Sequence, residues 1–80
     1  MVQMTAWDTE NDAREFFDSY EKRTLKRYPE AKPVTNTDVS RQWQTSSGTV
    51  VIDRRGTRVL ILEGIPSGID LSSLKRTVWQ

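Results

Sequence analysis

The second half of the chain contains three strand-like runs separated by very short turns. The runs cover residues 39–45, 49–54 and 57–63, and the turns between them are rich in Ser, Arg and Gly. Such short turns join neighbouring antiparallel strands, because a parallel connection needs about a dozen residues or more. The sequence therefore predicts a three-stranded antiparallel meander. Residues 59–62, VLIL, are apolar on both alternations, which predicts a strand that is covered on both faces or placed centrally.

A strand and a long helix are predicted before this meander. Residues 2–7 alternate between apolar and polar side chains, the period of a half-buried strand. A helix is then expected from about residue 9 to residue 28, and Pro29 ends it because proline cannot continue a helical turn. The residues that recur at helical spacing and form its apolar stripe are Ala13, Phe16, Phe17, Tyr20, Thr24 and Tyr28.

The stretch WDTENDAREFF, residues 7–17, carries four carboxylates and has two interpretations. A helix N-terminus favours acids through its partial positive charge. Either Asp8 or Thr9 can cap the helix, and Thr9 with Asp12 three residues later fits a capping box. The alternative is a calcium-binding loop, because the pattern D-x-E-x-D has the spacing of EF-hand ligands. That loop needs Gly at its sixth position and Glu at its twelfth, where the chain has Ala13 and Ser19. We therefore favour the helix start.

The two remaining segments are predicted to be a loop and a short helix. Residues 29–38 contain two prolines and a cluster of Thr, Asn and Asp, which is typical of an exposed loop. After the meander the letters GIPSG interrupt the strand pattern, and Asp70 can cap a last helix. The apolar residues placed on or beside one face of that helix are Leu71, Leu74, Val78 and Trp79.

These elements predict one small α+β domain over residues 1–80, in the order β-α-β-β-β-α. The antiparallel sheet is expected to carry the long helix on one face, while the short C-terminal helix closes an edge or an end. The predicted core consists of Met4, Ala13, Phe16, Phe17, Tyr20, Trp43, Val50, Ile52, Val59, Ile61, Leu71, Leu74 and Val78.

The composition disfavours catalysis. The chain has no cysteine and no histidine, so it lacks disulfides, thiolate metal sites, the cysteine nucleophile and the commonest general base. The letters SSLK place Lys75 one helical turn after Ser72, as in Ser/Lys hydrolases, but a polar helix face explains both residues without chemistry. We expect no enzymatic activity, no catalytic residue, no cofactor and no metal.

Basic residues gather in two places although the net charge is only +1. One group ends the long helix and the other occupies a predicted hairpin tip. Together they would form a basic patch if both lay on the same side of the molecule. The residues of this possible nucleic-acid or anion contact are Lys22, Arg23, Lys26, Arg27, Arg54, Arg55 and Arg58.

Two further features are shared with nucleic-acid-binding modules. From residue 9 onward the order of a helix, three antiparallel strands and a helix is that of the double-stranded-RNA-binding domain. That module begins its second helix with a lysine cluster, whereas here Asp70 comes first. Trp7, Trp43 and Trp79 could stack on bases, but each lies on or beside an amphipathic element, which favours packing.

The stretches AWDTENDAREFFDSY, residues 6–20, and RRGTRVLILEGIP, residues 54–66, resemble the C-terminal region of uncharacterised bacterial and archaeal proteins that are surface or lipoprotein-like. The resemblance implies a strand leading into a helix, followed by a hairpin. It implies structural roles for Trp7 at the strand end, Asp12 at the helix start and Phe16 in the core. It transfers no catalytic residue.

The leading hypothesis is a non-enzymatic protein-interaction or structural module, with a protein partner or a homo-oligomer formed through an unpaired strand edge. The alternative is a nucleic-acid-binding accessory module that uses the basic helix end and the Arg-rich hairpin tip. No run approaches the roughly 18–20 apolar residues of a membrane span, and the first residues lack the pattern of a signal peptide. We therefore expect a soluble chain whose location the sequence leaves open.

Overall fold

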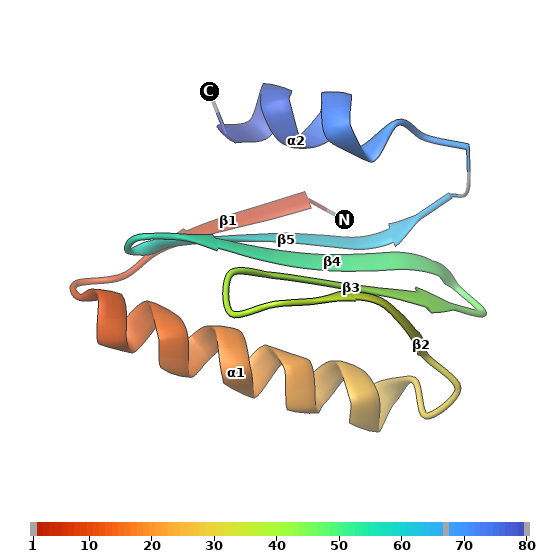
Figure 1. Ribbon diagram of the computed structural model, residues 1–80, viewed down its shortest axis with the longest axis horizontal. Coiled ribbons are helices and arrows are strands. Elements are labelled where there is room, and N and C mark those ends of the chain that lie inside the picture. The colour runs from red at the N-terminus through yellow and green to blue at the C-terminus, as the bar shows by residue number, and fades with distance from the viewer. Residues whose placement is uncertain (1, 67, 80) are drawn as a thin grey trace.

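The computed structural model describes residues 2–66 and 68–79 and shows two helices and five strands in this part of the chain (Figure 1). The α+β class is confirmed. Neither helix there is both long and apolar enough to cross a membrane. The elements are β1 Val2–Ala6, α1 Glu10–Arg27, β2 Lys32–Asn36, β3 Ser40–Thr45, β4 Gly48–Arg55, β5 Arg58–Ile65 and α2 Leu71–Trp79.

The five strands form one antiparallel sheet in the order β1-β5-β4-β3-β2. The predicted meander is β3-β4-β5, and its short turns join neighbouring strands as expected. Helix α1 lies on one face of the sheet and α2 on the other, so the molecule has three layers (Figure 1). The first strand lies at one edge of the sheet, and β2 lies at the other.

The larger core lies between α1 and the sheet. Thr9 caps the helix, because its Oγ1 accepts a hydrogen bond from the Asp12 amide at 3.1 Å, which confirms the predicted helix start. Buried Thr24 donates its hydroxyl to the Tyr20 carbonyl at 2.9 Å, and so satisfies its own polar group within the helix. The buried residues of this core are Ala13, Phe17, Tyr20, Trp43, Val50, Ile52, Val59 and Ile61.

A second core lies between the sheet and α2. Residues 59–62 are buried on both faces, as their double apolar alternation predicts. Helix α2 covers this second face, so the expectation that it closes an edge or an end is wrong. The reason is that β4 and β5 are apolar on both sides and both sides need cover. The buried residues of this core are Val51, Leu60, Leu62 and Ile65, and the half-buried ones are Leu71, Leu74, Val78 and Trp79.

The prediction of a loop over residues 29–38 is wrong, because β2 occupies part of that segment and pairs with β3. Pro33 cannot donate to a sheet ladder, but at the edge of a sheet its missing N–H is harmless. The pairing also shifts register between Pro33 and Thr35. The strand has no buried side chain and therefore no apolar alternation to reveal it. The observed order is β-α-β-β-β-β-α.

The predicted core also contains one error at β1. Met4 was expected to be buried and is 38% exposed, because α2 lies over β4 and β5 and leaves the neighbouring β1 uncovered. Phe16 is only half-buried at the margin of the larger core. The four buried residues of the second core were not in the predicted set, since only one face of each strand was counted.

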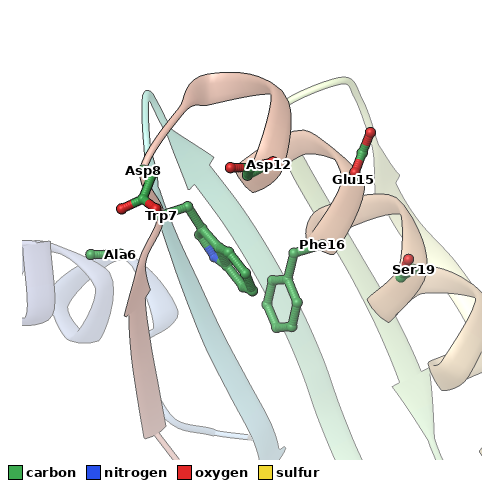
Figure 2. Close-up of a pocket in the computed structure, with 7 residues that line it drawn as sticks. All are labelled: Ala6, Trp7, Asp8, Asp12, Glu15, Phe16 and Ser19. Carbon is green, nitrogen blue, oxygen red and sulfur yellow. The ribbon is translucent and has the colours of Figure 1, made fainter.

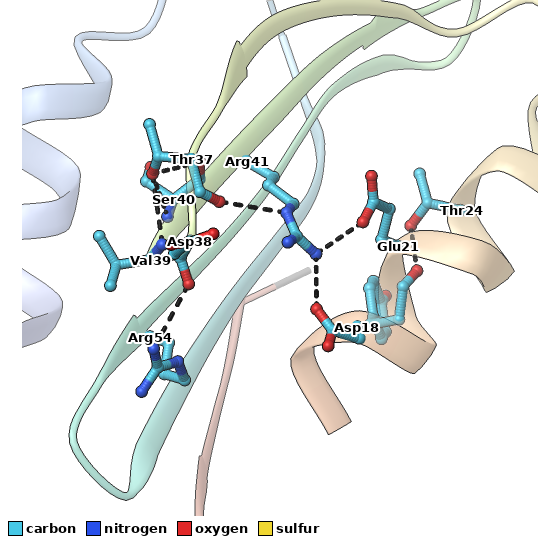
Figure 3. Close-up of polar contacts among 10 residues, drawn as sticks. Asp18, Glu21, Thr24, Thr37, Asp38, Val39, Ser40, Arg41 and Arg54 are labelled. Carbon is cyan, nitrogen blue, oxygen red and sulfur yellow. Dashed lines mark hydrogen bonds and ion pairs between the residues drawn. The ribbon is translucent and has the colours of Figure 1, made fainter. Parts of the chain in front are cut away.

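Arg41 fastens α1 to the sheet (Figure 3). Its Nη1 lies 3.0 Å from the Asp18 carboxylate and 2.6 Å from that of Glu21, both on α1. Its Nε donates to the Thr37 carbonyl at 3.2 Å in the β2–β3 turn, and its guanidinium lies 4.4 Å from the centre of the Phe17 ring. This mostly buried side chain therefore fixes where α1 sits, and with it the position of the α1 N-terminus beside β1.

Candidate interaction surface

The edge formed by β1 lacks the features that usually protect a sheet edge from pairing. Its residues, VQMTA, include no charged side chain and no proline. The opposite edge strand β2 carries Lys32, Pro33 and a register irregularity. Lysine, proline and bulges are the devices by which proteins prevent edge strands from pairing with other chains. The contrast makes β1 the candidate interaction edge.

The main-chain groups that β1 presents outward can be identified from its pairing with β5. The Trp7 amide donates to the Thr57 carbonyl at 2.9 Å. In an antiparallel ladder, hydrogen-bonded and non-hydrogen-bonded positions alternate, so the main chain of every second residue before Trp7 also faces β5. The remaining positions, Val2, Met4 and Ala6, direct their N–H and C=O groups to the open edge.

The same three residues form an apolar strip on the α2 side of the sheet. Val2 lies opposite Leu62 and Met4 lies opposite Leu60, so their side chains share the face of the second core. Val2 is nevertheless 50% exposed. On the far side of α2, the same face of β3 carries polar residues such as Gln42, which is opposite Val51. The polar side chains of β3 can be exposed to water without cost. The strip on β1 is apolar and is not covered by α2.

A hollow of about 510 Å³ borders the end of β1 on the α1 side. Figure 2 shows Trp7 and Phe16 facing each other inside it, with ring centroids 4.8 Å apart. The Trp7 Nε1 donates to the Thr5 Oγ1 at 3.0 Å, which fixes the indole against β1. The residues that line the hollow are Ala6, Trp7, Asp8, Asp12, Glu15, Phe16 and Ser19.

The seven predicted basic contact residues do not form a single patch. The β4–β5 turn lies near the start of α1, since a side-chain carbon added at Gly56 would be 3.8 Å from the Glu10 carboxylate. Lys22, Arg23, Lys26 and Arg27 lie towards the other end of α1, a helix about 27 Å long at 1.5 Å per residue. The hairpin-tip group and the helix-end group are therefore separated.

Two residues of the helix-end group, Arg23 and Arg27, already have contacts within the domain. Arg27 pairs with Glu63 at 3.1 Å, and its guanidinium lies 5.3 Å from the centre of the Tyr28 ring. Arg23 lies 5.4 Å from the centre of the Tyr20 ring. Burial, followed by the negative charge of Glu63, raises the pKa of the Tyr20 phenol above its ordinary value. The basic helix end is thus partly used to hold α1 against β5.

The hairpin tip instead meets α2, a juxtaposition that sequence reasoning missed. The Arg55 guanidinium lies 4.5 Å from the centre of the Trp79 ring, and Lys75 pairs with Asp53 at 3.1 Å. Asp53 also accepts a hydrogen bond from the Ser40 hydroxyl at 2.6 Å. No local pattern signals this meeting, because it depends on which face α2 covers. A second hollow, of about 480 Å³, lies where the hairpin tip meets α2, and we call it the basic hollow. It is lined by Arg55, Ser72, Lys75, Arg76 and Trp79.

The Ser/Lys pattern and the helix cap of α2 have structural partners. The ammonium of Lys75 is directed to Asp53 rather than to Ser72. The Asp70 carboxylate accepts hydrogen bonds from the Ser72 and Ser73 amides and from the Ser73 hydroxyl, which confirms it as the cap of α2. Hydrogen bonds from the Ser73 hydroxyl and amide hold the Asp70 pKa below its ordinary value, and the hydrogen bond from the Ser72 amide lowers it by a smaller amount.

Comparison with known proteins identifies a family. A family model described as a domain of unknown function, DUF8575, matches residues 1–75. The chain belongs to this family. No curated protein and no solved structure matches it. The DUF8575 match does not bear on the resemblance to bacterial and archaeal surface proteins, which stays a prediction.

In this DUF8575 domain, apolar side chains are exposed at β1 and also at Val34 and Val39 near the opposite edge, but β1, unlike β2, combines them with an edge strand free of charge and proline. Val2, Met4 and Ala6 supply both the unpaired main-chain groups and the uncovered apolar strip. Elsewhere, α1 and α2 cover the central strands on both faces. The β1 edge therefore has outward main-chain groups and an apolar strip without the lysine and proline that protect β2.

Proposed function

We propose that this DUF8575 domain is a non-enzymatic protein-interaction module that accepts an extended strand from a protein partner at the open edge of β1. The observation that carries the proposal is an edge strand with no charge and no proline, whose own Val2, Met4 and Ala6 side chains form an uncovered apolar strip. The absence of cysteine and histidine supports a binding role over catalysis.

Both main-chain and side-chain terms favour strand addition at this edge. The outward groups of Val2, Met4 and Ala6 provide a hydrogen-bonding ladder, and each bond contributes a net free energy of about 0.5–1.5 kcal/mol. Alternate side chains of the incoming strand would lie beside the apolar strip and cover it. The others would lie beside Gln3 and Thr5, which are polar. The expected partner segment therefore alternates between apolar and polar residues.

Amide hydrogen exchange tests this proposal at single-residue resolution. The protein is kept as dilute as the method allows, and a peptide of alternating valine and threonine with lysine at both ends is added in excess. We expect exchange of the Met4 and Ala6 amides to slow by at least about tenfold, which corresponds to about 1.4 kcal/mol. The amide of Asn36 on the protected edge β2 should be unaffected, since alternation from the Thr37–Ser40 hydrogen bond directs it outward.

The matched control is the same peptide with N-methyl groups on the main-chain nitrogens that would bond to β1. It keeps the side chains but cannot complete the ladder, so it should protect neither Met4 nor Ala6. Equal protection by both peptides, or protection of β2 instead of β1, would show that side-chain adhesion rather than strand addition is being observed. Absence of protection at saturating peptide would refute the proposal.

A second candidate function is nucleic-acid binding by the basic hollow, favoured by the meeting of Arg55, Lys75 and Arg76 at one place. Fluorescence anisotropy with labelled single-stranded RNA and DNA would measure it. In this case Arg76→Glu should weaken binding at least about tenfold and Lys26→Glu should not, and moderate salt should weaken binding of the unmodified chain. Salt-insensitive binding, or equal losses for the two variants, would contradict it.

A further inference from the structure

The identity of the strand that fits β1 can be inferred from the pattern of β1 itself. We propose that the partner strand is β1 of a second copy, paired antiparallel with Met4 opposite Met4 of the second copy. This inference rests on the proposed function, because it requires the edge to accept a strand. It adds the partner, the register and the symmetry of the complex.

Main-chain geometry favours this register. Hydrogen-bonded pairs across the new ladder can form only between residues whose N–H and C=O groups point outward, which here are Val2, Met4 and Ala6. With Met4 at the centre, each of these residues meets an outward-facing residue of the second copy: Val2 meets Ala6, Met4 meets Met4, and Ala6 meets Val2. A register centred on Gln3 or Thr5 leaves one outward residue of β1 without such a partner.

Side-chain chemistry favours the same register. On the α2 side, the apolar residues Val2 and Ala6 would face each other, and the two Met4 side chains would meet at the centre. On the α1 side, Gln3 would face Thr5, so polar side chains meet polar side chains. No charge lies opposite a like charge, because the strand carries none. The pattern apolar, polar, apolar, polar, apolar is therefore complementary to itself.

The symmetry explains how the uncovered strip becomes buried. Two copies joined by an antiparallel pair of identical strands are related by a two-fold axis perpendicular to the joined sheet. Both α2 helices then lie on one face of that sheet and both α1 helices on the other. The apolar strips of the two copies become the floor between the two α2 helices. Val2 and Met4, which are half-exposed in the single chain, would lose much of their exposure.

Disulfide trapping tests the register directly, because the chain has no cysteine of its own. In the proposed pair the two Met4 Cα atoms are about 5.5 Å apart, within the range of a disulfide. Met4→Cys should therefore be converted largely to a covalent dimer by a mild soluble oxidant. Dilution before oxidation should reduce the yield, as expected for a reversible dimer.

Gln3→Cys is the matched control on the neighbouring residue. The two Gln3 Cα atoms would be about 8–9 Å apart, since they are displaced by two residues along the strands, and this exceeds disulfide reach. Gln3→Cys alone should stay mostly monomeric after oxidation. A mixture of Gln3→Cys with Thr5→Cys should give the mixed dimer, because those positions face each other. Circular dichroism of each reduced variant confirms that it is folded.

A second measurement uses the mass of the complex in solution by sedimentation. The unmodified chain should approach twice its monomer mass as concentration rises. Met4→Lys, which places two ammonium groups opposite each other, should remain a monomer. The control Val34→Lys, at an exposed position of the other edge strand, should dimerise like the unmodified chain.

The possible outcomes separate this inference from the proposed function. Preferential trapping of Gln3→Cys would overturn the Met4-centred register. A chain that is monomeric at all concentrations and is not trapped through Met4→Cys would refute the second copy as the partner. If its β1 amides are still protected by the alternating peptide, strand addition stands and the partner is another protein. If that protection is also absent, both proposals are wrong.

Discussion

Phe17→Ala should lower the free energy of unfolding by about 3–5 kcal/mol. The Phe17 side chain is fully buried in the core between α1 and the sheet, and the Arg41 guanidinium packs on its ring at 4.4 Å. Truncation removes that apolar area from the core and leaves a cavity that the neighbouring strands can only partly fill. Domains have about 0.05–0.15 kcal/mol of stability per residue, so this loss is a large fraction of the total for 80 residues.

Urea unfolding followed by tryptophan fluorescence measures this effect, and the adjacent residue provides the control. Phe16 is half-buried at the hollow beside Trp7, so Phe16→Ala removes an aromatic contact without opening a closed cavity. We expect it to cost about 1–2 kcal/mol, well below the cost at Phe17. Equal losses for the two variants would contradict the assignment of Phe17 to the centre of the core and Phe16 to its margin.

The elements with strong local signals were predicted well from the sequence. Helix α1 has an apolar stripe, a capping residue at Thr9 and a terminating Pro29, and each of these signals acts on residues close to it in the sequence. The meander has apolar runs joined by turns too short for any other connection. The burial of residues 59–62 on both faces followed from their composition alone. These features depend on neighbours in the sequence, which is why the sequence reveals them.

The predictions that were wrong concern features that depend on neighbours in space. Strand β2 carries Pro33 and exposed side chains, so only its pairing with β3 identifies it as a strand. The exposure of Met4 follows from where α2 rests, and the alternation of β1 shows only which side of the strand Met4 occupies. Local patterns set the conformation of a segment, but the order of strands and the choice of face are set by packing of the whole chain.

The candidate site was predicted only in outline for the same reason. An unpaired strand edge was expected, but the sequence does not say which strands lie at the edges. Once β1 is known to be an edge, its uncharged sequence becomes informative. The basic residues illustrate the opposite case. Arg55 was grouped with the end of α1 and instead meets Trp79 and Lys75 of α2, more than fifteen residues away along the chain.

Gly48→Ala should be the second strongly destabilising substitution. Gly48 has φ of +117°, a conformation that residues with a side chain rarely adopt, at the tight turn where β3 leads into β4. A Cβ at this position would also lie 2.8 Å from the Ile65 carbonyl oxygen of β5, so main chain would have to move. Backbone strain of about 1–3 kcal/mol and a steric cost of similar size predict a total loss of about 2–6 kcal/mol.

Gly68→Ala separates the two causes. Gly68 has φ of +98°, but a Cβ there would meet nothing within 4 Å, so it carries the backbone strain without the clash. Its cost should therefore be about 1–2 kcal/mol, measured by the same urea unfolding. The difference between the two variants gives the contribution of the close approach between the β3–β4 turn and β5. If Gly48→Ala and Gly68→Ala destabilise equally, that approach relaxes without cost and the turn does not hold the end of β5 in place.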